Sequence, residues 1–244
     1  MLLKNIKNVI RKIIDKPIEP RKAYDMWAEI YDSGDYNLVF KMEEEIFNDL
    51  VGGLNLSGKV ILDYGCGNGR NLKRLASYKA AKIIACDISP KMLEQLKIKY
   101  PGFETHLIKS NSMLPFEHGT IDFILSTLVA AHIKDLRKVF SNWNNLLKSE
   151  GIIFISDLHP AILSAGGKRT FEKNGKTYQI KNYIHSVENI KKHFGLLNLE
   201  VIGFKESYIS ESSIDFYQKK NALHIYERYY GQPLVYGMLI RRKK

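Results

Sequence analysis

The stretch Val60-Ile-Leu-Asp-Tyr-Gly-Cys-Gly-Asn-Gly-Arg70 decides the fold of this 244-residue chain. Its apolar start, followed by Asp63 and by glycines at three alternate positions, predicts a β-strand that turns sharply into a helix. Gly65, Gly67 and Gly69 let the backbone approach a ligand closely, and two of them are expected to adopt positive φ. We therefore expect this turn to hold a ligand.

The spacing of these glycines narrows the chemistry of that ligand. The dinucleotide-binding pattern Gly-x-Gly-x-x-Gly needs a third glycine where this chain has Leu72, and no predicted strand is followed by a P-loop sequence. A second acid, Asp87, closes the next predicted strand. Acids on two neighbouring strands, beside a glycine turn, suit a ligand with a cationic amine and a ribose but no phosphate, which describes S-adenosylmethionine.

Further segments follow this turn in the order and spacing of a known family. They are Ala23-Tyr-Asp-Met-Trp-Ala-Glu-Ile-Tyr-Asp32, Cys86-Asp-Ile-Ser-Pro-Lys-Met-Leu93, Met113-Leu-Pro-Phe116, Ile121-Asp-Phe-Ile124 and Gly151-Ile-Ile-Phe-Ile-Ser-Asp157. Over roughly residues 20 to 240, the chain resembles the class I S-adenosylmethionine-dependent methyltransferases of the ubiquinone/menaquinone methyltransferase-like type (methyltransferase type 11). The resemblance implies an α/β, Rossmann-like, seven-stranded, mostly parallel sheet with helices on both faces and a C-terminal antiparallel hairpin.

Strand and helix signals alternate along the chain. Strands are predicted near 59–64, 82–87, 104–109, 120–126 and 151–157, and helices near 69–79, 90–99 and 135–148. This alternation predicts a parallel sheet covered on both faces, because right-handed crossovers place helices there. Two further strand-like segments, 199–208 and 234–240, are expected to complete the sheet as the hairpin that the resemblance implies.

An insertion at residues 158–185 separates the fifth strand from a helix that begins near Ser186. Asn174-Gly175 between apolar flanks predicts a small β-ribbon, which we expect over the carboxyl end of the sheet. Ligands of open α/β sheets bind at that end. The ribbon, N-terminal helices around Tyr24 to Tyr31 and the segment 209–232 are therefore the expected walls of an acceptor pocket.

Composition indicates one domain, at residues 20–244, behind a short N-terminal segment. The chain has 45% hydrophobic and 26% charged residues, as is ordinary for a soluble protein with a substantial core. Cys66 and Cys86 belong to no CxxC pattern or Cys/His cluster, so neither a disulfide framework nor a metal is expected. No apolar run approaches the roughly 20 residues of a membrane span, and no signal peptide is evident. We expect a cytoplasmic protein.

The formal net charge of +11 is concentrated at the two ends of the chain. Residues 1–22 carry +5 and residues 241–244 carry +4. The body of the domain therefore gives no compositional case for a broad phosphate-binding surface, and no nucleic-acid partner is expected.

Residues 1–16 are predicted to form a basic amphipathic helix. Apolar residues recur there at helical spacing with lysines and arginines between them, and Pro17 and Pro20 end the segment, 1–19. One interpretation is contact with an anionic membrane surface or a partner; the other, which we favour, is packing on the domain or on a second copy. The oligomeric state stays open.

The resemblance implies roles for the cofactor-binding residues. Asp63 receives the methionine amino group, directly or through water, and the glycines bring backbone groups against the amino acid and ribose. Asp87 accepts from both ribose hydroxyls, the alternative being a helix N-cap. Ser126 and Thr127 border the transferred methyl. The remaining expected cofactor contacts are Tyr24, Trp27, Tyr31, Cys66, Asn68, Ile88, Met92, Asn111, Ser112 and Met113.

Three of those expected contacts can also be interpreted as structural residues. Ile88 and Met92 either sandwich the adenine or pack in the core. Asn111 stands where the family usually has an aspartate that accepts from the adenine amino group; an amide oxygen can accept the same bond, and the alternative is a loop cap. The backbone amide of Ser112 is expected beside it.

Methyl transfer is an in-line displacement in which positioning supplies most of the catalysis. An acceptor that sheds a proton benefits from a base, for which histidine is the usual side chain at neutral pH. His132 follows the fourth predicted strand, His159 follows the fifth, and His185 opens the next helix, all at the carboxyl edge of the sheet. We hypothesise that one of them deprotonates the acceptor; each is otherwise a capping or core residue.

Two absences bear on the acceptor. Amino methyltransferases of adenine or glutamine amides carry Asn/Asp-Pro-Pro-aromatic after the fourth strand, where this chain has Leu125-Ser-Thr-Leu128. Protein arginine methyltransferases place paired glutamates in that region, and no acid occurs here between Asp122 and Asp135. Both absences favour a small, ring-bearing or lipophilic acceptor, methylated at oxygen, nitrogen or carbon. The alternatives are an RNA or tRNA methyltransferase and a non-catalytic module that binds an adenosyl ligand or docks on a membrane.

Overall fold

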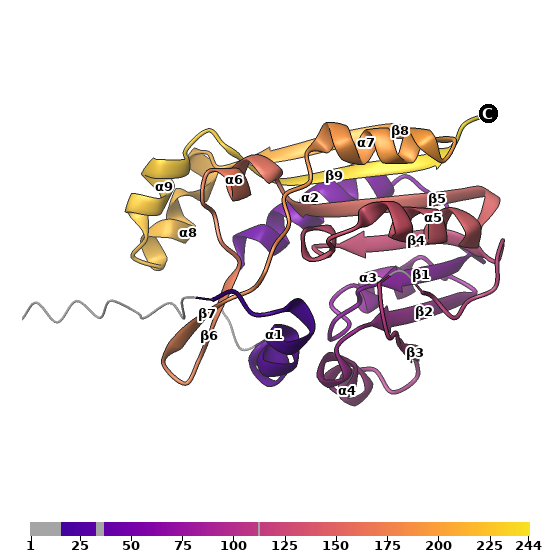
Figure 1. Cartoon of the computed structure of the whole chain (residues 1–244), viewed down its shortest axis with the longest axis horizontal. Coiled ribbons are helices and arrows are strands. Elements are labelled where there is room, and N and C mark those ends of the chain that lie inside the picture. Colours follow the sequence, from indigo (N-terminus) through magenta and orange to yellow (C-terminus); the bar gives the residue numbers. More distant parts are fainter. Residues whose placement is uncertain (1–15, 33–36, 112) are drawn as a thin grey trace, which may run out of the picture.

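The computed structural model describes residues 16–32, 37–111 and 113–244, so the predicted helix at residues 1–16 lies outside the described residues except for Lys16 (Figure 1). In chain order the elements are α1 (Pro20–Trp27), η1 (Ala28–Ile30), α2 (Leu38–Val51), β1 (Val60–Tyr64), α3 (Leu72–Ser77), β2 (Lys82–Asp87), α4 (Pro90–Lys99), β3 (Glu104–Leu107), β4 (Ile121–Thr127), η2 (Ala130–His132), α5 (Leu136–Leu146), β5 (Leu147–Leu158), α6 (Pro160–Ser164), β6 (Thr170–Lys173), β7 (Lys176–Gln179), α7 (Val187–Leu196), β8 (Leu199–Tyr208), η3 (Glu211–Ser213), α8 (Ile214–Lys219), α9 (Leu223–Tyr229) and β9 (Pro233–Arg242).

A seven-stranded sheet in the order β3-β2-β1-β4-β5-β9-β8 forms the centre of the molecule. Strands β1 to β5 are parallel, whereas β9 pairs antiparallel with both β5 and β8. The strand order reverses between β1 and β4, where Ile61 lies opposite Phe123. This arrangement confirms the predicted sheet and its C-terminal hairpin, and it puts the glycine turn after β1 at the switch point where open α/β sheets bind ligands.

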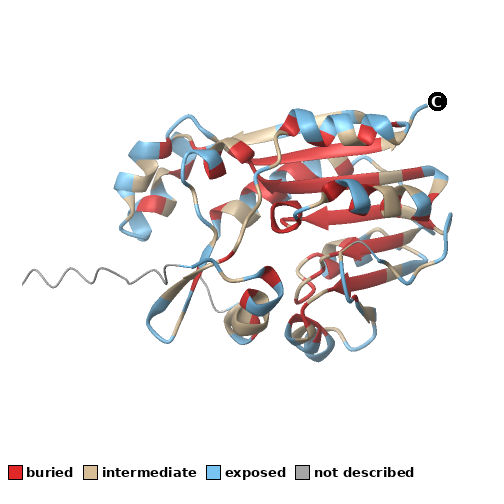
Figure 2. Ribbon diagram, viewed as in Figure 1, coloured by how far each residue is buried: buried red, intermediate tan, exposed pale blue. Residues whose placement is uncertain are grey.

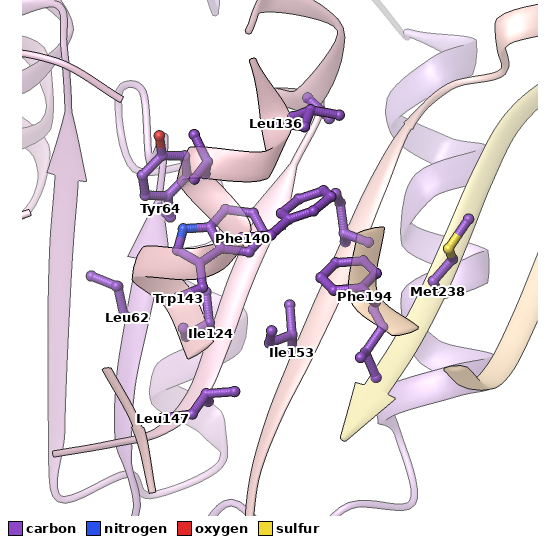
Figure 3. Packing of buried hydrophobic residues seen from close by; sticks show 14 of the residues in the cluster. Leu62, Tyr64, Ile124, Leu136, Phe140, Trp143, Leu147, Ile153, Phe194 and Met238 are labelled. Atoms are coloured by element: carbon purple, nitrogen blue, oxygen red, sulfur yellow. The ribbon is translucent and has the colours of Figure 1, made fainter. Parts of the chain in front are cut away.

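Alternate residues of the strands point into two apolar layers, because the side-chain period of a strand is two. On one face, Ile124 packs with α5 and α7, where the rings of Phe140 and Phe194 stack 4.2 Å apart (Figure 3). On the other face, Phe123 belongs to a cluster with Phe47 of α2. The central strands of the sheet are consequently buried from both sides, whereas the edge strands β3 and β8 are largely exposed or half-buried (Figure 2).

Side-chain caps fix where several helices begin. The Ser89 hydroxyl accepts from the Met92 N–H at 3.1 Å, and Pro90 occupies the first turn of α4. The Ser186 hydroxyl likewise accepts from the Asn189 N–H at 3.2 Å and starts α7. Such residues satisfy backbone N–H groups that lack a partner within the helix, and they start each helix at the carboxyl edge of the sheet.

The predicted β-ribbon is present as β6 and β7. Asn174 and Gly175 connect the two strands, and both have positive φ, as a tight two-residue hairpin turn requires. The ribbon packs on α1, where the rings of Phe171 and Trp27 stack 5.1 Å apart (Figure 1). This contact joins the N-terminal helix and the insertion into one wall.

The structure adds helices that the sequence interpretation did not include. Helix α2 lies along β9 and β8, and η3, α8 and α9 make up most of the segment 209–232. Helix α3 spans only Leu72–Ser77 of the predicted 69–79, because the glycine turn extends as far as its start. No helix in the described part of the chain combines the length and apolar character needed to cross a bilayer.

Candidate cofactor and acceptor site

The glycine turn is a tight bend held against β2. Gly65, Gly67 and Gly69 have φ values of 72°, 55° and 88°, so all three, rather than the expected two, use the left-handed region that favours glycine. The Gly65 and Cys66 N–H groups donate to the Cys86 carbonyl at 2.8 and 3.0 Å. A Cβ atom on Gly65 would lie 2.4 Å from Val129 Cγ2, so this glycine is also required for packing.

Asp87 lies at the end of β2, beside the glycine turn. Its Oδ2 accepts from the Gly67 N–H at 2.8 Å, and its Oδ1 accepts from the Ser89 N–H at 2.7 Å. Because Ser89 caps α4, Asp87 is not the N-cap of that helix. Burial raises the pKa of Asp87 although backbone N–H groups donate to it. Each oxygen keeps capacity for another donor, as a sugar hydroxyl would supply.

Asp63 is the most exceptional acid of the site. It is fully buried at β1, and neither carboxylate oxygen meets a hydrogen-bond donor among the described residues. Burial raises its pKa to about 7. A buried carboxylate without a partner is costly unless a ligand donates to it, so the orphaned Asp63 fits the ammonium of a bound amino acid group.

A hollow of about 70 Å³ lies over the glycine turn. Asn111, at its edge, is held by the Tyr64 hydroxyl, which donates to the Asn111 carbonyl and Oδ1 at 2.9 and 3.0 Å. Asn68 has a buried Oδ1 without a donor among the described groups. The expected cofactor contacts that line this hollow, called the smaller hollow below, are Tyr24, Tyr31, Gly65, Cys66, Gly67, Asn68, Asp87, Ile88, Met92, Asn111 and Thr127.

Several expected cofactor contacts do not line this hollow. Met113 is 73% exposed and borders neither this hollow nor the larger cavity described below. Ser112 lies outside the described residues. Trp27 borders the neighbouring cavity instead. Ser126 is buried in β4, and its hydroxyl finds no partner among the described residues. Asp63 and Gly69 are not among the residues that line this hollow.

Charged residues beneath the turn were missed by the sequence interpretation. Glu43 of α2 is fully buried and pairs with Arg70 Nη1 at 2.7 Å and Arg74 Nη2 at 3.0 Å. Burial pushes the pKa of Glu43 upward, but the two guanidinium groups outweigh it and hold that pKa below its usual value. Arg70 and Asn71 also donate to Thr127 Oγ1 at 3.1 and 2.9 Å. This network ties the glycine turn to α2 and to the end of β4.

A second cavity, of about 640 Å³, adjoins the smaller hollow. Tyr24, Tyr31 and Leu128 border both spaces. Leu128 has φ of 62°, which costs a branched residue about 1–2 kcal/mol. Its carbonyl accepts from Arg169 Nη1 at 2.7 Å and its N–H donates to the Ser156 carbonyl at 2.7 Å, so both sides of this residue are fixed.

His132 stands at the junction of the two spaces. Its Nε2 lies 2.9 Å from the Tyr24 hydroxyl and 2.7 Å from Arg169 Nη1, and its Nδ1 lies 3.0 Å from the Lys181 carbonyl. Since a carbonyl only accepts, Nδ1 carries the proton and Nε2 is the acceptor. Burial, followed by the Arg169 charge, lowers the pKa of His132 to about 3, so the ring is neutral at neutral pH.

The other two candidate histidines lie outside both cavities. His159 caps α6: its Nδ1 accepts from the Ala161 N–H at 3.1 Å, which leaves Nε2 to donate to Glu206 at 2.9 Å. His185 Nε2 lies 2.7 Å from the Ile133 carbonyl, in a separate small pocket. The sequence placed both near the carboxyl edge, but only His132 faces the site.

Comparison with known proteins agrees with this geometry. Residues 62–155 match the family model described as "Methyltransferase domain". The chain is 28% identical over 160 residues to a malonyl-[acyl-carrier protein] O-methyltransferase of Methylovorus sp., covering 62% of this chain and 53% of that one. It is 26% identical over 176 residues to a tRNA U34 carboxymethyltransferase of Campylobacter curvus, covering 68% and 57%. The chain thus spans little more than half the length of these relatives.

A solved structure shares the fold. An S-adenosylmethionine-dependent methyltransferase from Mesorhizobium loti superposes with a TM-score of 0.65 at 16% identity, covering 82% of this chain and 98% of that one. The segment that matches the family model contains the glycine turn and Asp87. Residues 62–155 therefore match the methyltransferase domain family, and the chain has the fold of the S-adenosylmethionine-dependent methyltransferase that it resembles.

Proposed function

We propose that this protein transfers the methyl group of S-adenosylmethionine to a small-molecule acceptor held in the larger cavity. The observation that carries the proposal is the shared wall of Tyr24, Tyr31 and Leu128. It sets a hollow with the features of an adenosyl-ligand site directly against a cavity large enough for a metabolite. A protein that only bound the adenosyl ligand would have no need of the second cavity.

The residues over the glycine turn fit the cofactor. Asp63 is assigned to the amino group and Asp87 to the ribose hydroxyls. A Cβ on Gly67 would project into open space, with no atom within 4 Å, so the glycine leaves that space free for the ligand. When bound, S-adenosylmethionine supplies a methyl group on a sulfonium sulfur, from which a neutral thioether departs. The protein's task is then to align the acceptor.

His132 and Tyr24 are the polar side chains best placed for that alignment. With its low pKa, His132 is neutral and offers Nε2 to the Tyr24 hydroxyl at 2.9 Å. We assign His132 to orienting Tyr24 by accepting a hydrogen bond from its hydroxyl. We do not assign it the role of a base, because the positive charge of Arg169, 2.7 Å from Nε2, disfavours protonation of the ring. Among the three candidate histidines it alone borders the smaller hollow.

The acceptor is assigned to small molecules because of the cavity. Its walls come from α1, the loop before β6 and the helices of segment 209–232, and they form a partly open, mostly apolar pocket of a size that suits a small molecule. The charge of +11 is concentrated at the chain ends and gives RNA binding its main support. The experiment must therefore distinguish methylation of RNA from methylation of a small molecule.

The test supplies the purified full-length protein with methyl-labelled S-adenosylmethionine and, in parallel, a metabolite extract or total RNA. We expect label in the low-molecular-weight fraction, and none in RNA. An Asp87→Ala variant should bind S-adenosylhomocysteine about 10- to 100-fold more weakly in calorimetry, because charge-assisted hydrogen bonds are lost. Asp215→Ala, which removes an exposed acid on α8, is the matched control. Labelled RNA alone, or unchanged affinity in Asp87→Ala, would refute the proposal.

A further inference from the structure

The charges that border the larger cavity are all positive among the described residues. Lys168, Arg169 and Arg228 line it, and no aspartate or glutamate does. Arg169 is neutralised by Asp157, whose Oδ1 lies 2.9 Å from its Nη2. Lys168 and Arg228 take part in no ion pair within the described part of the chain. The rim therefore carries two cations without a counterion.

The fold brings Arg228 against the loop that leads to Lys168, and both side chains are exposed at the cavity. Arg228 of α9 donates from Nη2 to the Ala165 carbonyl at 3.3 Å and lies 5.1 Å from the centre of the Tyr229 ring. The Tyr229 hydroxyl donates to the same carbonyl at 3.3 Å. Gly166 has φ of 93°, in the left-handed region that favours glycine, and it turns the loop against α9. The docked loop continues directly into Lys168.

Away from this rim, the cavity is mostly apolar. Its lining includes the indole of Trp27 and the rings of Tyr217 and Tyr229, with aliphatic side chains between them. An apolar wall beside the exposed Lys168 and Arg228 favours an apolar ligand body and offers no competing polar partner for an anion. The combination favours a ligand with an apolar body that ends in a negative charge. A cationic amine would find no carboxylate among the cavity's lining residues to receive it.

From this arrangement we infer that the acceptor is an anionic amphiphile, with an apolar or ring-bearing body in the cavity and a carboxylate or similar anionic group at Lys168 and Arg228. The inference rests on the proposed function and makes its substrate class specific. Because Tyr24 and Leu128 lie at the cofactor side of the cavity, the methylated atom of the acceptor is expected beside them.

Three probes with the same body test the inference: 5-phenylpentanoate, 5-phenylpentanamide and 5-phenylpentylamine. Each is titrated calorimetrically into the full-length protein saturated with S-adenosylhomocysteine, and tryptophan emission is recorded in parallel. The chain has two tryptophans; Trp143 is buried in the core, so Trp27 reports on the cavity. We expect the carboxylate to bind at least 10-fold more tightly than the amide and the amine, with an emission change that Trp27→Phe removes.

A double variant locates the anion. Lys168→Met with Arg228→Met should weaken the carboxylate at least 10-fold and the amide less than 2-fold, which controls for lost packing. Lys97→Met with Lys192→Met removes the same charge from exposed positions outside the cavity and should change neither. Equal binding of the three probes, no binding by any of them, or an unaffected double variant overturns the inference. Absence of S-adenosylhomocysteine binding would instead overturn the proposed function.

Discussion

Replacing Asp63 with asparagine is expected to stabilise the ligand-free protein by an amount that grows with pH. Burial raises the pKa of Asp63 from 3.8 to about 7. An acid whose pKa is raised by folding costs nothing below its unfolded pKa, costs more as pH rises, and reaches its full cost above the folded pKa. These values give a cost of about 2 kcal/mol at pH 5 and about 4 kcal/mol at pH 8.

The assay is urea unfolding of the wild type and the Asp63→Asn variant between pH 5 and pH 8. The difference in unfolding free energy should move in favour of the variant by about 2 kcal/mol across that range. An asparagine amide in the same place has its own desolvation cost, but that cost does not change with pH. Asp215→Asn, at an exposed position on α8, should show no such trend.

Ligand affinity gives the same group a second readout. Because an ammonium favours the ionised carboxylate, S-adenosylhomocysteine should bind the wild type about tenfold more tightly for each pH unit up to about pH 7. The Asp63→Asn variant should bind weakly, with no such slope. A stability difference that is flat with pH, or equal affinities of the two proteins, would refute the assignment of Asp63 to the amino group.

Two further substitutions test the residues beneath the glycine turn. Glu43→Gln should lower the unfolding free energy at pH 7 by about 3–5 kcal/mol, because Arg70 and Arg74 lose their buried partner. The folded pKa of Glu43 lies below its usual 4.5, so the wild type should lose this advantage as pH falls through that folded pKa. Urea unfolding at several pH values checks both expectations. Gly65→Ala should cost about 1–3 kcal/mol by thermal unfolding, because the new Cβ meets Val129, and no loss would contradict the packing argument.

Much of the fold follows from local signals. The strand at 82–87, the helix at 90–99 and the strand at 199–208 were predicted with the bounds that the structure has, because apolar runs mark the strands and Ser89-Pro90 marks the start of the helix. Helix α2 was not included, although the apolar positions Leu38, Met42 and Ile46 recur at its helical spacing and Asn37 caps it. The signal for that helix was present in the sequence.

The site was less predictable than the fold, because side-chain direction depends on tertiary packing. Glu43 lies 27 residues before Arg70, and only the docking of α2 beside the glycine turn brings the two together. His159 follows a strand at the correct edge, yet its ring turns to cap α6 and to meet Glu206. The glycine turn and Asp87 were predictable since their backbone connections are local to neighbouring strands. Their binding roles stay predictions.

The wall shared by the two spaces has a consequence for engineering. A substitution at Tyr24, Tyr31 or Leu128 alters the shape of both chambers, so a library built there would trade cofactor retention against any new acceptor range. Tyr217 and Ile225 border the larger chamber alone. Substitutions at those two positions are expected to alter selectivity for the acceptor while leaving the binding of the methyl donor unchanged.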